Sequence, residues 1–158
     1  MPARRPDPAR LLAAVNAQRA ALGIPPWAGA QSLTALGGAS IEAVLAALDT
    51  GAQPQPQALR TAVVHLLDLL AARAPGRAVE VRIPPYAAIQ CVAGTRHTRG
   101  TPPNVVETDA VTWIMLATGR LTWSQAAAGG QLRASGSRAN LAEYLPLAAS
   151  VPDAGGHH

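Results

Sequence analysis

The chain has 158 residues, 49% of them hydrophobic, and its 13 basic residues, all arginine, exceed nine acidic residues to give a net charge of +4. This length predicts one ordinary domain or a small domain with an extension, and the apolar content excludes disorder throughout. No apolar stretch is long enough for a transmembrane helix, so we expect no stable membrane insertion. The arginines form no basic block and only five residues are aromatic, so we expect no nucleic-acid partner.

The cysteine content and the chain ends bear on the compartment. Cys91 is the single cysteine, so no internal disulfide can form, which fits a reducing environment. The first residues lack the apolar run of a secretory signal. We therefore expect a cytoplasmic protein. Residues 149–158 are small and polar and are expected to form a disordered tail, in which His157 and His158 are assigned no role.

The first elements in chain order are helices. Asp7 followed by proline predicts a helix start, and the apolar spacing continues to about Leu22. Residues 24–38 are rich in proline, glycine and serine and predict a loop. Ser40 is expected to cap a second, short helix. These helices and a proline-rich linker make up a predicted N-terminal extension over residues 1–54.

The strongest helix is predicted from about Gln57 to Ala74, because its leucines and valines recur at helical spacing. The period then changes to two at Val79, Val81 and Ile83, which indicates a half-buried strand. Residues 87–92 predict a second strand, antiparallel to the first.

The last third alternates short elements. We predict a third strand at residues 105–108, a helix over 109–118 and a short helix opened by Thr122 and Gln125, which have capping-box spacing. A fourth strand is predicted over 131–135. Ser137 is expected to cap a final helix whose apolar face carries Leu141, Tyr144 and Leu145.

The run from Thr118 to Ser137 resembles the C-terminal half of the sterol carrier protein 2 (SCP-2-like) family, in its bacterial branch. The family pattern alternates glycines with small and apolar residues at fixed spacing. The matching positions are Gly119, Leu121, Ala126, Gly130, Leu132, Ala134, Gly136 and Leu141. The resemblance covers roughly residues 55–148, and related domains form the C-terminal part of mycothiol-dependent maleylpyruvate isomerases.

The resemblance implies an α/β (α+β) fold, in which helices cover a small, mostly antiparallel sheet and enclose an apolar tunnel for lipids. The partner would be a hydrophobic small molecule or lipid, bound without a cofactor, and the oligomeric state is left open. The expected tunnel wall is apolar and includes Trp113 and Trp123, for which core packing is the alternative. Its residues are Ile89, Trp113, Ile114, Ala117, Leu121, Trp123, Ala126, Leu132 and Ala134.

Two other functions stay open beside a lipid carrier. If the small residues pack closely, the chain would be a structural or interaction module with a closed fold. It could also be an accessory subunit of an enzyme that acts on acyl or thiol substrates. A continuous apolar void would favour the carrier, and a closed core would favour the module.

Catalytic chemistry is not indicated by the residue pattern. His65 and Asp68 can pair on one helix, but a metal site needs three or four ligands, and no further histidine or cysteine is suitably spaced. Cys91 lies in an apolar strand and is expected to be a buried structural thiol. We therefore expect no metal and no enzymatic activity.

Residues 94–104 form the segment with the most chemical character. Arg96, His97 and Arg99 lie between glycines, and arginine side chains suit phosphate or carboxylate groups. We predict an anion-recognising rim at the mouth of the tunnel. The alternative is a solvated loop whose arginines pair with Glu107 or Asp109.

Overall fold

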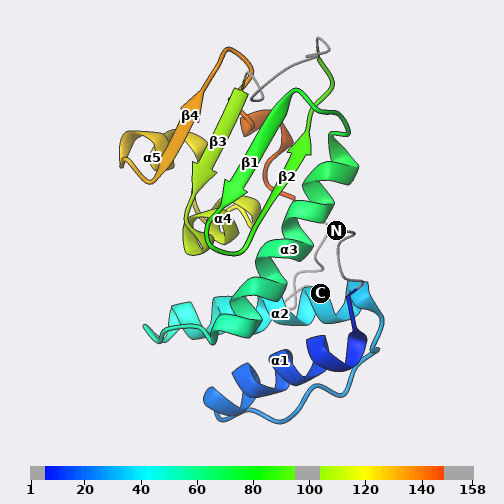
Figure 1. Cartoon of the computed structure of the whole chain (residues 1–158). Helices are drawn as coiled ribbons and strands as arrows, with labels where there is room; N and C mark the ends of the chain where they lie inside the picture. Colours follow the sequence, from blue (N-terminus) through cyan, green and yellow to red (C-terminus); the bar gives the residue numbers. More distant parts are fainter. Residues whose placement is uncertain (1–5, 95–103, 148–158) are drawn as a thin grey trace, which may run out of the picture. The chain divides into compact units, whose positions relative to one another are not determined.

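The computed structural model describes residues 6–94 and 104–147. Its contacts divide the chain into two compact units, Met1–His65 and Leu66–His158, which meet within one helix. Figure 1 labels the helices and strands of both units. Among the helices described, none is long and apolar enough to cross a membrane.

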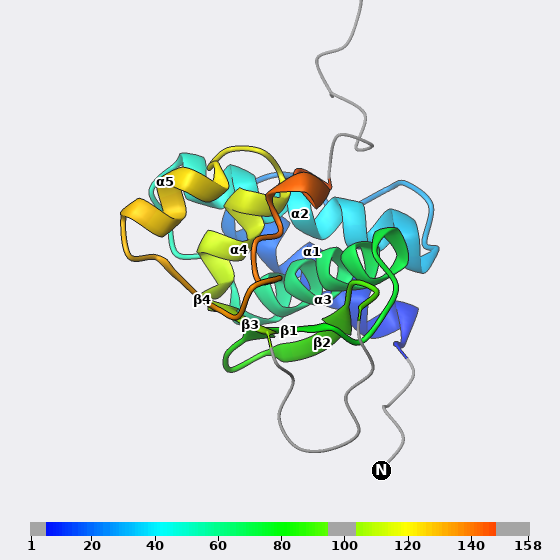
Figure 2. The same ribbon diagram turned by 90° about the horizontal axis from the view of Figure 1, so that it is seen from above.

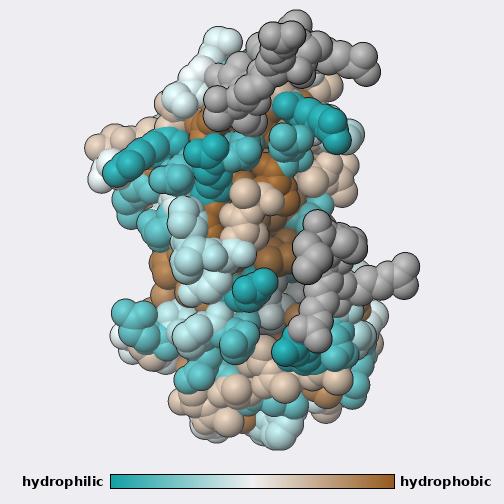
Figure 3. All heavy atoms as spheres, viewed as in Figure 1, coloured by the Kyte–Doolittle hydropathy of each residue, from teal (hydrophilic) through white to brown (hydrophobic). Residues whose placement is uncertain are grey.

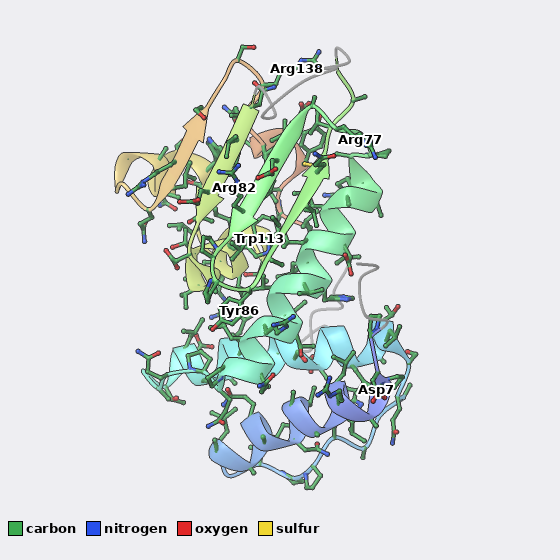
Figure 4. The ribbon with its side chains drawn as sticks, viewed as in Figure 1. Asp7, Arg77, Arg82, Tyr86, Trp113 and Arg138 are labelled. Carbon is green, nitrogen blue, oxygen red and sulfur yellow. The ribbon has the colours of Figure 1, made fainter. Side chains whose placement is uncertain are left out.

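The first unit contains α1 (Pro8–Ala21), α2 (Leu33–Asp49) and the first part of α3 (Pro56–Arg73). The side chain of Asp7 (Figure 4) caps α1 by accepting a hydrogen bond from the Ala9 N–H at 3.0 Å. The buried Gln18 side chain accepts from the Gln55 N–H at 2.6 Å and so fixes the turn before α3 to α1. The long helix predicted from Gln57 to Ala74 is confirmed within one residue at each end.

The start of α2 differs from the expectation. The predicted loop over residues 24–38 ends six residues early, because α2 begins at Leu33 with Ser32 as its N-cap, not Ser40. The sequence indicates a loop here because Gly37 and Gly38 lie in the first turns of this helix. Gly37 belongs in the helix because the imidazole of His65 packs against it so closely that a Cβ would collide with the ring. Ser40 is instead buried inside α2.

The second unit is built on a four-stranded sheet in the order β2-β1-β3-β4. The strands are β1 (Val79–Ile83), β2 (Ala87–Cys91), β3 (Asn104–Thr108) and β4 (Leu132–Ser135). The β1–β2 and β3–β4 pairs are antiparallel and β1–β3 is parallel, which confirms the predicted fold class and the mostly antiparallel sheet. Figure 2 shows α4 (Ala110–Ala117) and the later turns of α3 on one face of this sheet.

The core of this unit follows from the alternation along the strands. Val79, Val81 and Ile83 face the helices and are fully buried. The later turns of α3 bury Leu66 and Leu70, and α4 adds Trp113, Ile114 and Ala117 (Trp113 is labelled in Figure 4). One layer of helices on one face of a sheet therefore encloses the apolar side chains.

The C-terminal part contains α5 (Trp123–Ala128) and a single 3₁₀ turn, η1 (Ala142–Tyr144). The prediction of a final α-helix from Ser137 is wrong, because within residues 137–147 only this short turn forms. Local side-chain bonds compete with a helix here: the Asn104 carboxamide oxygen accepts from the Arg138 N–H at 2.9 Å, and Asn140 accepts from the Ala142 N–H at 2.9 Å.

Candidate functional site

A hydrophobic cluster lies where α4, α5, β4 and the C-terminal segment meet, and we call it the α5 cluster. Its buried members are Leu116, Ala126 and Leu132, which come from α4, α5 and β4. Three partly buried apolar side chains pack against them, namely Leu121, Trp123 and Leu145. These three side chains give the α5 cluster an apolar border that solvent reaches.

Short-range bonds set the position of α5. Gly119, with a φ of 80°, ends α4, and the N–H groups of Arg120 and Leu121 both donate to the Met115 carbonyl, at 2.9 and 3.2 Å. The predicted capping box is confirmed: Thr122 accepts from the Gln125 N–H at 3.1 Å, and the Gln125 side chain accepts from the Thr122 N–H at 2.9 Å. Leu121 and Trp123 are thereby placed on the two sides of the cap.

The C-terminal segment closes another side of the α5 cluster. The Leu147 N–H donates to the carbonyl of Ala117 at 2.8 Å. Arg73 of α3 donates to the carbonyls of Tyr144 at 2.9 Å and Pro146 at 3.0 Å. Leu145 lies between these anchors, so its side chain is held against the cluster.

The structure brings together four of the nine residues predicted for a tunnel wall: Leu121, Trp123, Ala126 and Leu132 all belong to the α5 cluster. The three α4 residues of that prediction are almost completely buried, with exposed fractions of 2% for Trp113 and 0% for Ile114 and Ala117. Ile89 is half-buried on β2, and Ala134 is exposed on β4.

Leu116 and Leu145 belong to the α5 cluster but were not among the residues predicted for a tunnel wall. Leu145 lay on the apolar face of the final helix that was expected from the sequence, so its spacing marked it as buried without indicating what it contacts. Leu116 follows Ile114 and Met115 in an uninterrupted apolar run, which has no periodicity that would assign its face.

Ala134 identifies where the helix-facing side of the sheet becomes accessible. It pairs with Val106, which is 2% exposed, so both side chains lie on the face that carries the helices. Ala134 is nevertheless exposed. Beyond the α5 cluster, the helix side of the sheet therefore opens toward solvent at β4.

The opposite face of the sheet carries charged side chains. Glu80 and Arg82 of β1 form an ion pair on it. The register places Glu107 of β3 beside Arg82, and Arg133 of β4 beside Glu107. Charges of alternating sign thus run across the sheet, and Figure 3 shows hydrophilic side chains beside apolar ones on this side of the molecule (Arg82 is labelled in Figure 4). An apolar ligand on this face would remove charged groups from water, which favours the helix side.

None of the candidate chemical groups belongs to the α5 cluster. Cys91 is fully buried on β2, and burial raises the pKa of its thiol from 9.0 to about 11, so the thiolate is disfavoured. His65 is half-buried against Gly37, and Asp68 is exposed on α3. Within residues 6–94 and 104–147, no three His, Cys, Asp or Glu side chains are grouped to hold a metal ion.

The predicted anion rim, Arg96, His97 and Arg99, lies outside the described residues. The residues that flank this segment are well fixed. The buried Asn104 donates to the Ala78 carbonyl at 2.8 Å, and Arg138 donates to the Ala93 carbonyl. Residues 94 and 104 therefore both lie at the same end of the sheet.

Comparison with known protein families places the larger, C-terminal part of the chain. The model of the family described as "Bacterial SCP ortholog", where SCP stands for sterol carrier protein, matches residues 55–147. The match begins just before α3 and ends at Leu147, so it includes the sheet, the α5 cluster and the C-terminal segment. It does not test the expected relation to maleylpyruvate isomerases, which stays a prediction. A comparison with curated proteins found no match.

Proposed function

Since this chain belongs to the family of bacterial SCP orthologs, we propose that it binds and carries a hydrophobic ligand without catalysis. The ligand class is a lipid, a fatty acyl group or a sterol-like molecule. The observation that carries the proposal is the α5 cluster, in which four predicted wall residues meet and three partly buried apolar side chains border solvent.

The two faces of the sheet support this location. The face of the sheet opposite the helices carries alternating charges, so an apolar chain bound there would remove charged groups from water at a high free-energy cost. On the helix side, the same ligand would contact leucine, tryptophan and alanine side chains, and each buried methylene group would contribute about 0.8 kcal/mol.

The first experiment asks whether a ligand is present at all. Native mass spectrometry of freshly purified protein should detect a co-purified lipid as a discrete added mass. Titration with a fluorescent fatty acid then measures affinity. Ala126→Leu fills the α5 cluster, because Ala126 is fully buried, and should weaken binding on the order of tenfold.

Ala127→Leu provides the matched control, because the neighbouring alanine on the same helix is exposed. It adds the same side chain in the same helix and should leave affinity within about twofold of the parent, a change of about 0.4 kcal/mol. Equal affinity in both variants, or no detectable binding to the parent protein, would contradict the proposed site.

The charged head of a fatty acid would also need a partner, because a bare buried charge is costly. Arg96 and Arg99 are proposed for that role. Changing both to glutamine should weaken the binding of an anionic lipid by about 1–3 kcal/mol, the scale of a charged hydrogen bond. Binding of a neutral sterol should barely change. Equal affinity for the anionic lipid in the parent and double variant would reject the rim.

A closed interaction module is the second candidate, and the nearly complete burial of Trp113, Ile114 and Ala117 favours it. These residues leave little surface for a ligand deep in the fold. In that case no lipid would co-purify, and the Ala126→Leu change would alter stability without any effect on ligand binding.

A further inference from the structure

The connector between α1 and α2 in the first unit exposes apolar residues. Ile24 is 38% exposed and is followed by the exposed Pro25 and Pro26 and the half-buried Trp27. We call these four residues the Ile24–Trp27 segment. Among the described residues, the exposed large hydrophobic side chains are Ile24 and Leu33, which is 42% exposed at the start of α2. A contiguous group of exposed apolar side chains, unlike a single one, often marks a binding surface.

The segment is fixed by bonds within the first unit. The Ile24 N–H donates to the Arg19 carbonyl at 3.0 Å, and the Trp27 N–H donates to the Asn16 side-chain oxygen at 2.7 Å. The Trp27 indole N–H donates to the Ala30 carbonyl at 3.0 Å. The connector therefore folds back along α1 with a defined conformation.

These bonds also satisfy the backbone donors of the segment. Ile24 and Trp27 both use their N–H groups, and Pro25 and Pro26 have none. The four consecutive residues thus offer no unpaired backbone N–H group. Backbone N–H groups that enter a lipid layer need a partner, because an unsatisfied polar group there costs several kcal/mol. In water, the solvent itself would satisfy them.

The sequence on both sides of the segment contains more basic than acidic residues. The sequence from Pro8 through Ile41 contains Arg10 and Arg19 and no acidic residue. The Arg19 guanidinium lies 5.7 Å from the centre of the Trp27 ring, and its Nε donates to the Pro25 carbonyl at 2.6 Å. A cation and a tryptophan beside an apolar tip are the groups that favour an anionic membrane interface.

We propose that the Ile24–Trp27 segment docks the first unit reversibly on an anionic lipid bilayer. Ile24 and the two prolines enter the interfacial region, and Arg19 lies at the level of the lipid phosphates. The segment precedes residues 55–147, which match the family model. The inference therefore stands apart from ligand binding by the second unit and can fail while the carrier proposal holds.

The test is sedimentation of the full chain with vesicles of phosphatidylcholine and phosphatidylglycerol in a ratio of about 3:1, at low and high salt. The parent protein should sediment with these vesicles at low salt and much less with pure phosphatidylcholine. Ile24→Glu should lower the partition coefficient on the order of tenfold or more, because it removes buried apolar area and adds a repelled charge. Arg19→Gln should reduce the salt dependence.

Leu33→Glu is the matched control, because it makes the same change at a similarly exposed side chain outside the segment. It should retain most of the binding. Quenching of Trp27 by brominated lipid provides a second measurement that needs no destabilising change, and Trp27→Phe should remove that part of the quenching. Equal binding of all variants, or equal loss in both glutamate variants, would overturn the proposal. A dimer that dissociates on Ile24→Glu with unchanged vesicle binding would also overturn it and assign the segment to a second copy.

Discussion

The core beneath β1 and the α5 cluster use the same kinds of side chain but differ in how completely they are closed. Leu66, Val81 and Ile114 are 0% exposed in the core. In the α5 cluster, by contrast, Leu121, Trp123 and Leu145 are only partly buried. Residues of the first kind hold the fold together, and residues of the second kind are the ones that we propose contact the ligand. The comparison predicts that changes in the core alter stability and changes in the α5 cluster alter binding.

The largest expected effect is on the core side of this comparison. Leu66→Ala should lower the free energy of unfolding by about 2–5 kcal/mol, because the truncated side chain leaves a cavity among fully buried neighbours. Urea denaturation of the parent and the variant measures this difference. A loss below about 0.5 kcal/mol would show that this part of α3 contributes little to the core.

A second way to probe the closed core uses pH. Burial raises the pKa of the Cys91 thiol from 9.0 to about 11. The unfolded chain therefore releases the thiol proton at a lower pH than the folded protein does. The contribution of the protonated Cys91 thiol to stability is present below pH 9.0 and is lost as the pH rises toward 11. Full loss corresponds to about 2–3 kcal/mol, since each pKa unit is worth about 1.4 kcal/mol.

Cys91→Val should remove most of this decline, and the comparison is clear because the sequence contains no lysine that would titrate in the same range. Burial and the neighbouring Glu143 also raise the pKa of Tyr144 from 10.0, which adds a further decline above pH 10. Parallel stability curves for parent and variant between pH 9 and 11 would contradict the closed environment of Cys91.

The caps of α4 and α5 allow a comparison of the two regions through smaller changes in stability. Asp109 begins α4 and accepts from both the N–H and the hydroxyl of Thr112, each at 2.8 Å, in a part-buried site. Asp109→Ala should cost about 1–2 kcal/mol. Thr122→Ala, at the exposed cap of α5, should cost about 0.5–1 kcal/mol. Chemical denaturation ranks the two, and the reverse order would show that α5 is anchored more firmly than α4.

Much of the second unit could be predicted from the sequence. Alternation at Val79, Val81 and Ile83 and the Thr122–Gln125 capping box are local patterns, and local patterns determined β1 and the start of α5. The start of α2 could not be predicted, because Gly37 is accounted for by its contact with His65, 28 residues later in the chain. Asn104 and Arg138 form a bond of similar range, which replaces the expected final helix.

The sequence pattern indicated some residues of the α5 cluster but not how open their surroundings are. Leu121, Ala126 and Leu132 share a spacing pattern that the family resemblance makes visible, and the structure brings them into one cluster. The pattern also includes Ala134, which is exposed at the sheet edge. Whether a small side chain lines a wall or borders an opening depends on how far the helices extend over the sheet, and residue spacing does not encode that distance.

The smallest expected change in stability belongs to the α5 cluster. Leu121→Ala should lower the free energy of unfolding by less than about 1 kcal/mol, because a partly exposed side chain leaves no closed cavity when it is shortened. The affinity for a fluorescent fatty acid should nevertheless fall about threefold to tenfold, since the ligand loses apolar contact area. Leu22→Ala makes the same truncation at a half-buried leucine of the first unit and should leave this affinity unchanged. If Leu121→Ala costs as much stability as Leu66→Ala, or if both Leu121→Ala and Leu22→Ala weaken binding equally, the α5 cluster is part of the closed core and the ligand lies elsewhere.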